Sequence, residues 1–210
     1  MTSSMRALVA SAVLCAAVSS CAPPTSSDAD AGDSPGSGST SGTFVDTAGS
    51  PSGPASQELT QTDGRTWAFR SDDVTLLYFG YTSCPDVCPT TMADLAAALR
   101  SMPKAADDVT VRFVTTDPRR DTLRQLRTWL GGFDPDFVGA RAPIDRVVEA
   151  AEQYGIGIEA PKVTKGNYEV THGAQVLVLR PDGRSVGYFR EGTTPTEFRH
   201  LLPGLIEEAS

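Results

Sequence analysis

The chain has 210 residues, of which 40% are hydrophobic, and 26 acidic against 18 basic side chains give it a formal net charge of −8. This acidic balance argues against nucleic-acid binding, which normally depends on a basic face or stripe. About the first fifty residues contain almost nothing that could build a core, so we expect one folded domain at residues 57–210.

Residues 1–20 have the layout of a secretory signal peptide. A single base, Arg6, precedes an apolar run from Ala7 to Val18, which is shorter than the roughly 20 residues that a membrane-spanning helix needs. The next residues, VSSC at Val18–Cys21, resemble a bacterial lipobox. The resemblance implies lipidation of Cys21 and an anchor on the outer face of the cytoplasmic membrane. The alternative is ordinary cleavage that leaves Cys21 as a free thiol.

Residues 21–56 consist mainly of Ser, Gly, Thr, Pro, Ala and Asp. Phe44 and Val45 are almost the only bulky apolar side chains in this segment. Such a composition cannot bury enough surface to offset the entropy lost on ordering. We therefore expect a flexible tether that holds the domain near a membrane and leaves it free to move.

The remaining sequence predicts strands and helices in alternation. Asp63-Gly64 is a strong turn signal within Glu58–Phe69, which predicts a hairpin. The apolar and aromatic run Thr75–Tyr81 is typical of a strand that is buried on both faces. Further strands are expected at 109–116, 175–180 and 185–189, and helices around Met92–Leu99 and at 122–130, 144–154 and 197–208. The order indicates an α/β sandwich of thioredoxin type, with a mixed central sheet flanked by helices and an added N-terminal hairpin.

Cys84 and Cys88 lie between the buried strand and the first helix. A structural disulfide is possible, but across so short a loop it would stabilise little. A helix N-terminus favours reactive thiolates, whereas the three-residue spacing and the carboxylate of Asp86 argue against a dithiol oxidoreductase. Two thiolates one turn apart can also bind one soft metal ion if a third ligand is available. The pair alone leaves these three interpretations open.

Two histidines are candidates for the third ligand. His200 falls among apolar residues of the last expected helix, where packing or capping is its expected role. His172 falls in a polar loop before the strand at 175–180, from which it could point across the end of the sheet.

Three segments together resemble the Sco/SenC copper chaperones: YFGYTSCPDVCPTTM at Tyr78–Met92, TTDPRRDT at Thr115–Thr122, and VTHG at Val170–Gly173. The resemblance extends from about Glu58 to the end of the chain. It implies a thioredoxin-like domain that holds one copper ion, as Cu(I) or Cu(II), through Cys84, Cys88 and His172.

The DPxRD motif of the family is present at Asp117–Asp121. The resemblance implies that Asp117 and Asp121 lie behind the metal ligands or face a partner, and the alternative is that Asp121 caps the following helix. Many relatives carry Asp before the histidine and Ser or Thr after it, where this chain has Thr171 and Gly173. This departure removes a carboxylate that could support the imidazole.

The resemblance also implies a function. It is that of a monomeric metallochaperone, rather than an enzyme in the strict sense, that acts on a copper-site subunit of a haem–copper respiratory oxidase. The chaperone would deliver copper to the binuclear site of that subunit or keep its thiols reduced. The rival hypothesis is a membrane-tethered thiol–disulfide oxidoreductase that neither binds nor delivers a metal ion. A thioredoxin-like peroxidase is a third class, but the sequence has no clear peroxidatic motif.

Overall fold

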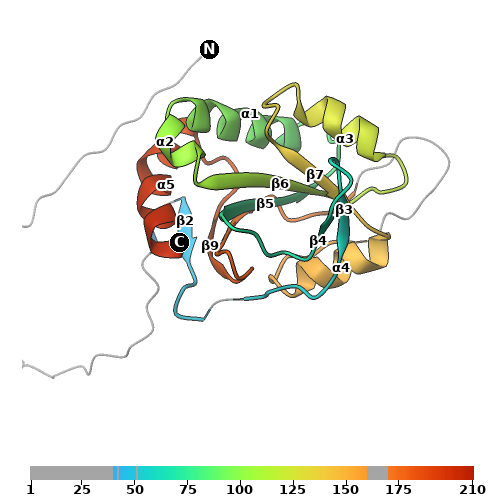
Figure 1. The fold of residues 1–210 in the computed structure, drawn as a ribbon, viewed down its shortest axis with the longest axis horizontal. Helices are drawn as coiled ribbons and strands as arrows, with labels where there is room; N and C mark the ends of the chain where they lie inside the picture. The colour runs from blue at the N-terminus through green and yellow to red at the C-terminus, as the bar shows by residue number, and fades with distance from the viewer. Residues whose placement is uncertain (1–39, 42, 51, 160–169) are drawn as a thin grey trace, which may run out of the picture. The chain divides into compact units, whose positions relative to one another are not determined.

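The computed structural model describes residues 40–41, 43–50, 52–159 and 170–210, and Figure 1 shows their arrangement. The expected signal peptide, Cys21 and residues 21–39 of the expected tether lie outside this part of the chain. Within it, no helix combines the length and the apolar character that crossing a bilayer requires.

One mixed sheet of nine strands forms the centre of the domain, in the order β1-β2-β9-β8-β5-β6-β7-β3-β4. The strands are β1 Thr40–Ser41, β2 Phe44–Asp46, β3 Leu59–Gln61, β4 Thr66–Trp67, β5 Val74–Gly80, β6 Val109–Thr115, β7 Val138–Arg141, β8 Val176–Leu179 and β9 Ser185–Phe189. The middle strands β5, β6 and β7 are parallel, and their neighbours on both sides are antiparallel. The expected mixed central sheet is therefore confirmed.

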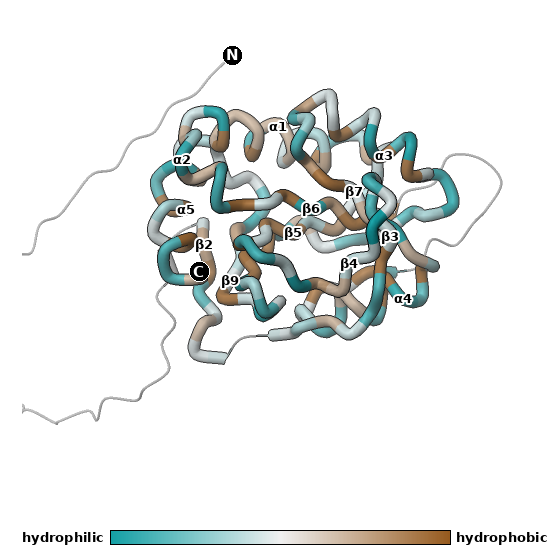
Figure 2. The backbone as a smooth tube through the Cα atoms, viewed as in Figure 1, coloured by the Kyte–Doolittle hydropathy of each residue, from teal (hydrophilic) through white to brown (hydrophobic). Residues whose placement is uncertain are grey.

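Helices cover both faces of this sheet (Figure 1). They are α1 Val87–Arg100, α2 Pro103–Ala106, α3 Leu123–Leu130, α4 Ile144–Glu152 and α5 Pro195–Ala209. All seven residues of β5 are buried, as a strand between two helical layers requires. Leu76 and Tyr78 pack in the core that includes α1, α3 and α5, whereas Leu77 and Phe79 pack in the core that includes α4. Figure 2 shows hydrophobic residues gathered along the central strands between these layers.

The expected N-terminal hairpin is confirmed as β3 and β4. Gly64 stands in the turn with a φ of +86°, a backbone conformation that glycine adopts without a steric penalty. β3 also pairs with β7, so the hairpin extends the sheet at that edge.

The domain begins earlier than the expected boundary at residue 57. β2 pairs with β9, and the ring of Phe44 is 6% exposed and lies 4.9 Å from the ring of Phe189. Ala55 is also buried. The C-terminal part of the expected flexible tether is therefore folded, because one buried aromatic side chain and backbone pairing with β9 suffice to extend the sheet on this side. The average composition of the segment does not reveal the contribution of this single side chain, Phe44.

The sequence analysis also missed β7. Gly139 in this strand lies directly beneath α3, since a Cβ atom there would stand 2.9 Å from the Cβ of Leu126. The close approach of the helix requires a small residue, and small residues remove the β-branched pattern by which strands are usually identified.

Candidate metal centre

The two cysteines come from a loop and from the helix that follows it. Cys84 lies between β5 and α1, and its backbone N–H donates to the carbonyl of Tyr81 at 3.2 Å. Cys88 lies in the first turn of α1 and is completely buried, whereas Cys84 is 9% exposed. Neither forms a disulfide. The packing of Cys88 requires glycine at position 80, because a Cβ atom there would stand 2.9 Å from its sulfur.

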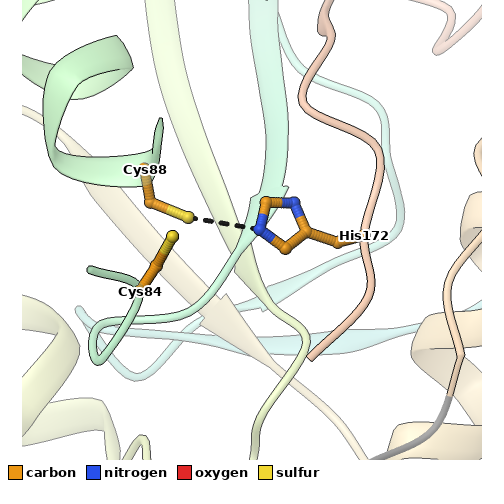
Figure 3. Close-up of side chains that lie close together, drawn as sticks. All are labelled: Cys84, Cys88 and His172. Atoms are coloured by element: carbon orange, nitrogen blue, oxygen red, sulfur yellow. Dashed lines mark hydrogen bonds between the residues drawn. The ribbon is translucent and has the colours of Figure 1, made fainter. Parts of the chain in front are cut away.

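His172 meets this pair from the segment that precedes β8, as Figure 3 shows. Its Nε2 lies 3.4 Å from the Sγ of Cys88. The two sulfurs and the imidazole nitrogen all lie within 4.8 Å of one another, and no other group of three or more His, Cys, Asp or Glu residues converges in this way in the described part of the chain. The structure therefore brings together the three predicted ligands. His200 is exposed and lies inside α5, whose caps are Thr194 and Ser210, so the expectation that it packs or caps was wrong.

The orientation of the imidazole is set by its backbone. Nδ1 lies 3.1 Å from the carbonyl oxygen of Gly173. A carbonyl can only accept, so this hydrogen bond places the proton on Nδ1 and leaves the lone pair of Nε2 directed toward Cys88. Thr171 is exposed. The support expected from a preceding carboxylate is supplied here by a main-chain carbonyl, which keeps the same tautomer without a charge.

Aromatic rings enclose the imidazole. The rings of Tyr78 and Tyr81 approach it edge-on, with centroids 6.0 and 5.6 Å away. The hydroxyl of Tyr78 also points to the sulfur of Cys88 at 3.9 Å. These contacts limit rotation of the ring and keep water from its apolar edges.

Burial sets the protonation states of the centre. It raises the pKa of the Cys88 thiol well above its ordinary range, and the neighbouring Cys84 adds to the effect. It also lowers the pKa of His172. From the sequence, the helix N-terminus favoured a thiolate and Asp86 opposed it, whereas in the structure the loss of hydration is the main cause of the raised pKa of Cys88. Without metal, Cys88 is a neutral thiol beside a neutral imidazole, and a metal ion must displace the thiol proton.

Asp121 holds the cysteine loop in place. This carboxylate is fully buried and accepts hydrogen bonds from the backbone N–H of Thr82 at 3.0 Å, from the Thr82 hydroxyl at 2.5 Å, and from the Thr115 hydroxyl at 2.6 Å. The alternative that Asp121 caps α3 was wrong, because the N-cap is Thr122 in a capping box with Gln125. Asp121 therefore connects the end of β6 to the residues just before Cys84.

Asp117 reaches the imidazole through two other side chains. It is fully buried and forms an ion pair with the guanidinium of Arg120. That guanidinium lies over the ring of Tyr81 at 5.6 Å, and the same ring contacts His172. Sequence reasoning named Asp117 and Asp121 but missed the partners through which they act. These partners, Thr82, Thr115 and Tyr81, are not typical metal ligands. Only the pairing of β5 with β6 shows that they lie near the two aspartates.

Comparison with known proteins gives this geometry a family context. The family SCO1/SenC matches residues 48–207. A protein of Stutzerimonas stutzeri is 28% identical over 63% of this chain, and a SCO2 homolog of Danio rerio is 30% identical over 60%. These alignments span 65% and 47% of the two relatives, so this chain matches only about half to two thirds of their length.

Solved structures agree with this match. The structure of Bradyrhizobium japonicum ScoI with copper bound is 33% identical, covers 73% of this chain and 98% of that one, and has a TM-score of 0.63. The solution structure of apo Sco1 from Thermus thermophilus is also 33% identical, with 74% and 92% covered and a TM-score of 0.63. The expected thioredoxin-like Sco fold is confirmed by these neighbours. With the fold, the CPDVC loop and the convergent histidine all in place, the chain belongs to the SCO1/SenC family.

Proposed function

We propose that this protein is a copper metallochaperone, which carries one copper ion on Cys84, Cys88 and His172 as its cargo. The observation that carries the proposal is the convergence of two sulfurs and one imidazole nitrogen within 4.8 Å. Two thiolates and an imidazole are soft and borderline ligands that suit Cu(I), and the same set also accepts Cu(II). Copper in the related Bradyrhizobium structure supports this choice of metal.

The proposed client is the subunit of a haem–copper oxidase that contains a binuclear copper site. This client comes from the family resemblance of the three motifs. The protein acts as a monomer and delivers copper to that site or keeps its thiols reduced. The exposed fraction of Cys84, 9% against none for Cys88, makes it the sulfur that an acceptor ligand reaches first.

Titration of the reduced protein with Cu(I) tests the copper proposal. We expect one equivalent to bind to the wild type and weaker binding to His172→Ala, because two sulfurs alone leave the ion without its third ligand. His200→Ala is the matched control, since that histidine is exposed on α5 and should leave the affinity unchanged.

The rival oxidoreductase makes the opposite prediction for the same variants. It requires a Cys84–Cys88 disulfide whose reduction potential is the same in the wild type and in His172→Ala, together with no stoichiometric copper binding. That pair of results would overturn the chaperone.

We also propose that Cys21 is lipidated and holds the domain at the outer face of the cytoplasmic membrane. The VSSC sequence supports this location. In cells labelled with radioactive palmitate, Cys21→Ser should lose the label and leave the membrane fraction, while Cys15→Ser should behave as the wild type. A Cys21→Ser protein that stays equally bound to the membrane would contradict the anchor.

A further inference from the structure

A pocket lies at the same end of the sheet as the metal centre, where the parallel strands finish. The register of the parallel strands pairs Gly80 with Thr115 and Val114 with Ala140. The cysteine loop, the DPRRD loop and the residues after β7 therefore all begin at the carboxyl ends of these strands. Beside the last two is a pocket of about 490 Å³. Figure 1 shows α3, β3 and β7, which surround it, on one side of the molecule.

Two arginines give this pocket its charge. Arg119 is exposed and forms no ion pair with any residue that the structure describes. Arg141 donates from Nη2 to the carbonyl oxygen of Pro118 at 2.5 Å, but its buried Nε has no hydrogen-bond partner in the described part of the chain. A buried guanidinium N–H without an acceptor is costly, so the protein itself satisfies this guanidinium only in part.

Among the residues that the structure describes, no carboxylate forms an ion pair with either arginine. None of the residues that line the pocket is acidic. The two acids of the adjacent loop are already engaged, Asp117 with Arg120 and Asp121 with the two threonines. The chain has a net charge of −8, but this pocket is lined by two arginines and no acid, so its local charge is positive.

The rest of the lining is largely apolar and includes Pro118, Leu123, Ala142 and Pro143. A small inorganic anion would satisfy the arginines and leave this apolar surface uncovered. A carboxylate that is attached to an apolar group satisfies both parts, because a guanidinium binds a carboxylate with two parallel hydrogen bonds.

We propose that this pocket binds an acidic side chain flanked by an apolar residue on a peptide segment of a partner protein. The identification of that partner as the copper acceptor rests on the proposed function. One loop connects the two sites: Arg119 lines the pocket, while the next residue, Arg120, lies over the Tyr81 ring that contacts His172. A segment bound in the pocket would place the partner at the end of the sheet where the metal is exchanged.

NMR titration of the reduced, copper-free protein tests the proposal. The probes are the blocked peptide acetyl-Gly-Gly-Leu-Glu-Gly-Gly-amide, the same peptide with Gln in place of Glu, and sodium phosphate. We expect the glutamate peptide to shift the Nε–H resonance of Arg141 and the amide resonances of Leu123 and Ala142. The glutamine peptide should shift them far less, and phosphate should shift the arginine resonance without the apolar ones.

Arg119→Gln should raise the dissociation constant of the glutamate peptide by about tenfold, the effect of losing one charge-assisted hydrogen-bond pair. Arg127→Gln is the matched control, since it removes an exposed charge from α3 outside the pocket. Both arginines are exposed, so neither variant should unfold.

Equal shifts with the glutamate and glutamine peptides, or an unchanged constant in Arg119→Gln, would overturn the proposal. Phosphate that binds as tightly as the peptide would also overturn it, in favour of an inorganic anion site. Peptide and Cu(I) binding by the wild type separate the two hypotheses. A wild type that binds one copper ion but not the glutamate peptide contradicts this inference alone, and a wild type that binds the peptide but no copper contradicts the proposed function alone.

Discussion

The two halves of the metal centre are built in different ways. In the sulfur half, Cys88 lies in α1 and is completely buried, and Cys84 lies in the preceding loop, which Asp121 fastens. The imidazole half stands on a segment outside any helix or strand, and His172 is only partly buried. It is held by backbone hydrogen bonds with Gly173 and Phe79 and by the edges of two tyrosine rings. The fold thus fixes the sulfurs, whereas local contacts fix the histidine, and we expect copper release to begin at the imidazole.

The largest expected effect is that of Cys88→Ser, which removes a ligand from the rigid half. Cu(I) affinity should fall by more than the roughly 10–100-fold that loss of an outer partner costs, because a neutral hydroxyl cannot replace a thiolate on a soft ion. Competition against a chromophoric Cu(I) chelator measures the affinity, and circular dichroism checks the fold. A loss smaller than that of His172→Ala would reverse the ranking of the two halves.

The pH dependence of copper binding separates the halves without removing either. The raised pKa of Cys88 keeps this thiol protonated through neutral pH, so binding releases its proton, and this proton alone should lower the apparent dissociation constant about tenfold per pH unit. The lowered pKa of His172 keeps the imidazole neutral there, so it adds proton competition only at acid pH, below its ordinary value of about 6.5.

In His172→Ala, the slope near neutral pH should therefore persist and the additional acid dependence should disappear. The Cu(I) competition assay repeated at several pH values makes this comparison. A neutral slope that vanishes with the histidine would contradict the assignment of the released proton to Cys88.

Asp121→Asn should weaken the support of the sulfur half. An amide presents an N–H₂ group toward hydroxyl and amide donors, so at least one of the three hydrogen bonds is lost in a buried site. We expect the free energy of unfolding to decrease by about 1–3 kcal/mol. Asp108→Asn, at an exposed position, is the control. Equal stability of the two variants in urea denaturation would show that the network does not fasten the loop.

The sequence predicted the ligands of the centre but not their supports. Cys84 and Cys88 belong to one short motif, and the polar loop around His172 gave the third ligand only through the family resemblance. The roles of Gly173, Thr82 and Tyr81 depend on which segments the sheet brings together, and no pattern within one segment contains that information. For the same reason β2 and β7 escaped detection, since each is stabilised by a partner that is distant in the sequence.

Tyr81→Leu tests the flexible half and should give the smallest effect. The edge-to-face contact with His172 is worth about 0.5–1.5 kcal/mol, so its loss should weaken Cu(I) binding by about tenfold or less. Tyr81→Phe is the matched variant, because it keeps the ring and should retain most of the affinity. If Tyr81→Phe were as weak as Tyr81→Leu, the hydroxyl rather than the ring would support the imidazole. If Tyr81→Leu matched the loss in Cys88→Ser, the imidazole half would depend on its packing as strongly as the sulfur half depends on its ligand, and the proposed order of copper release would fail.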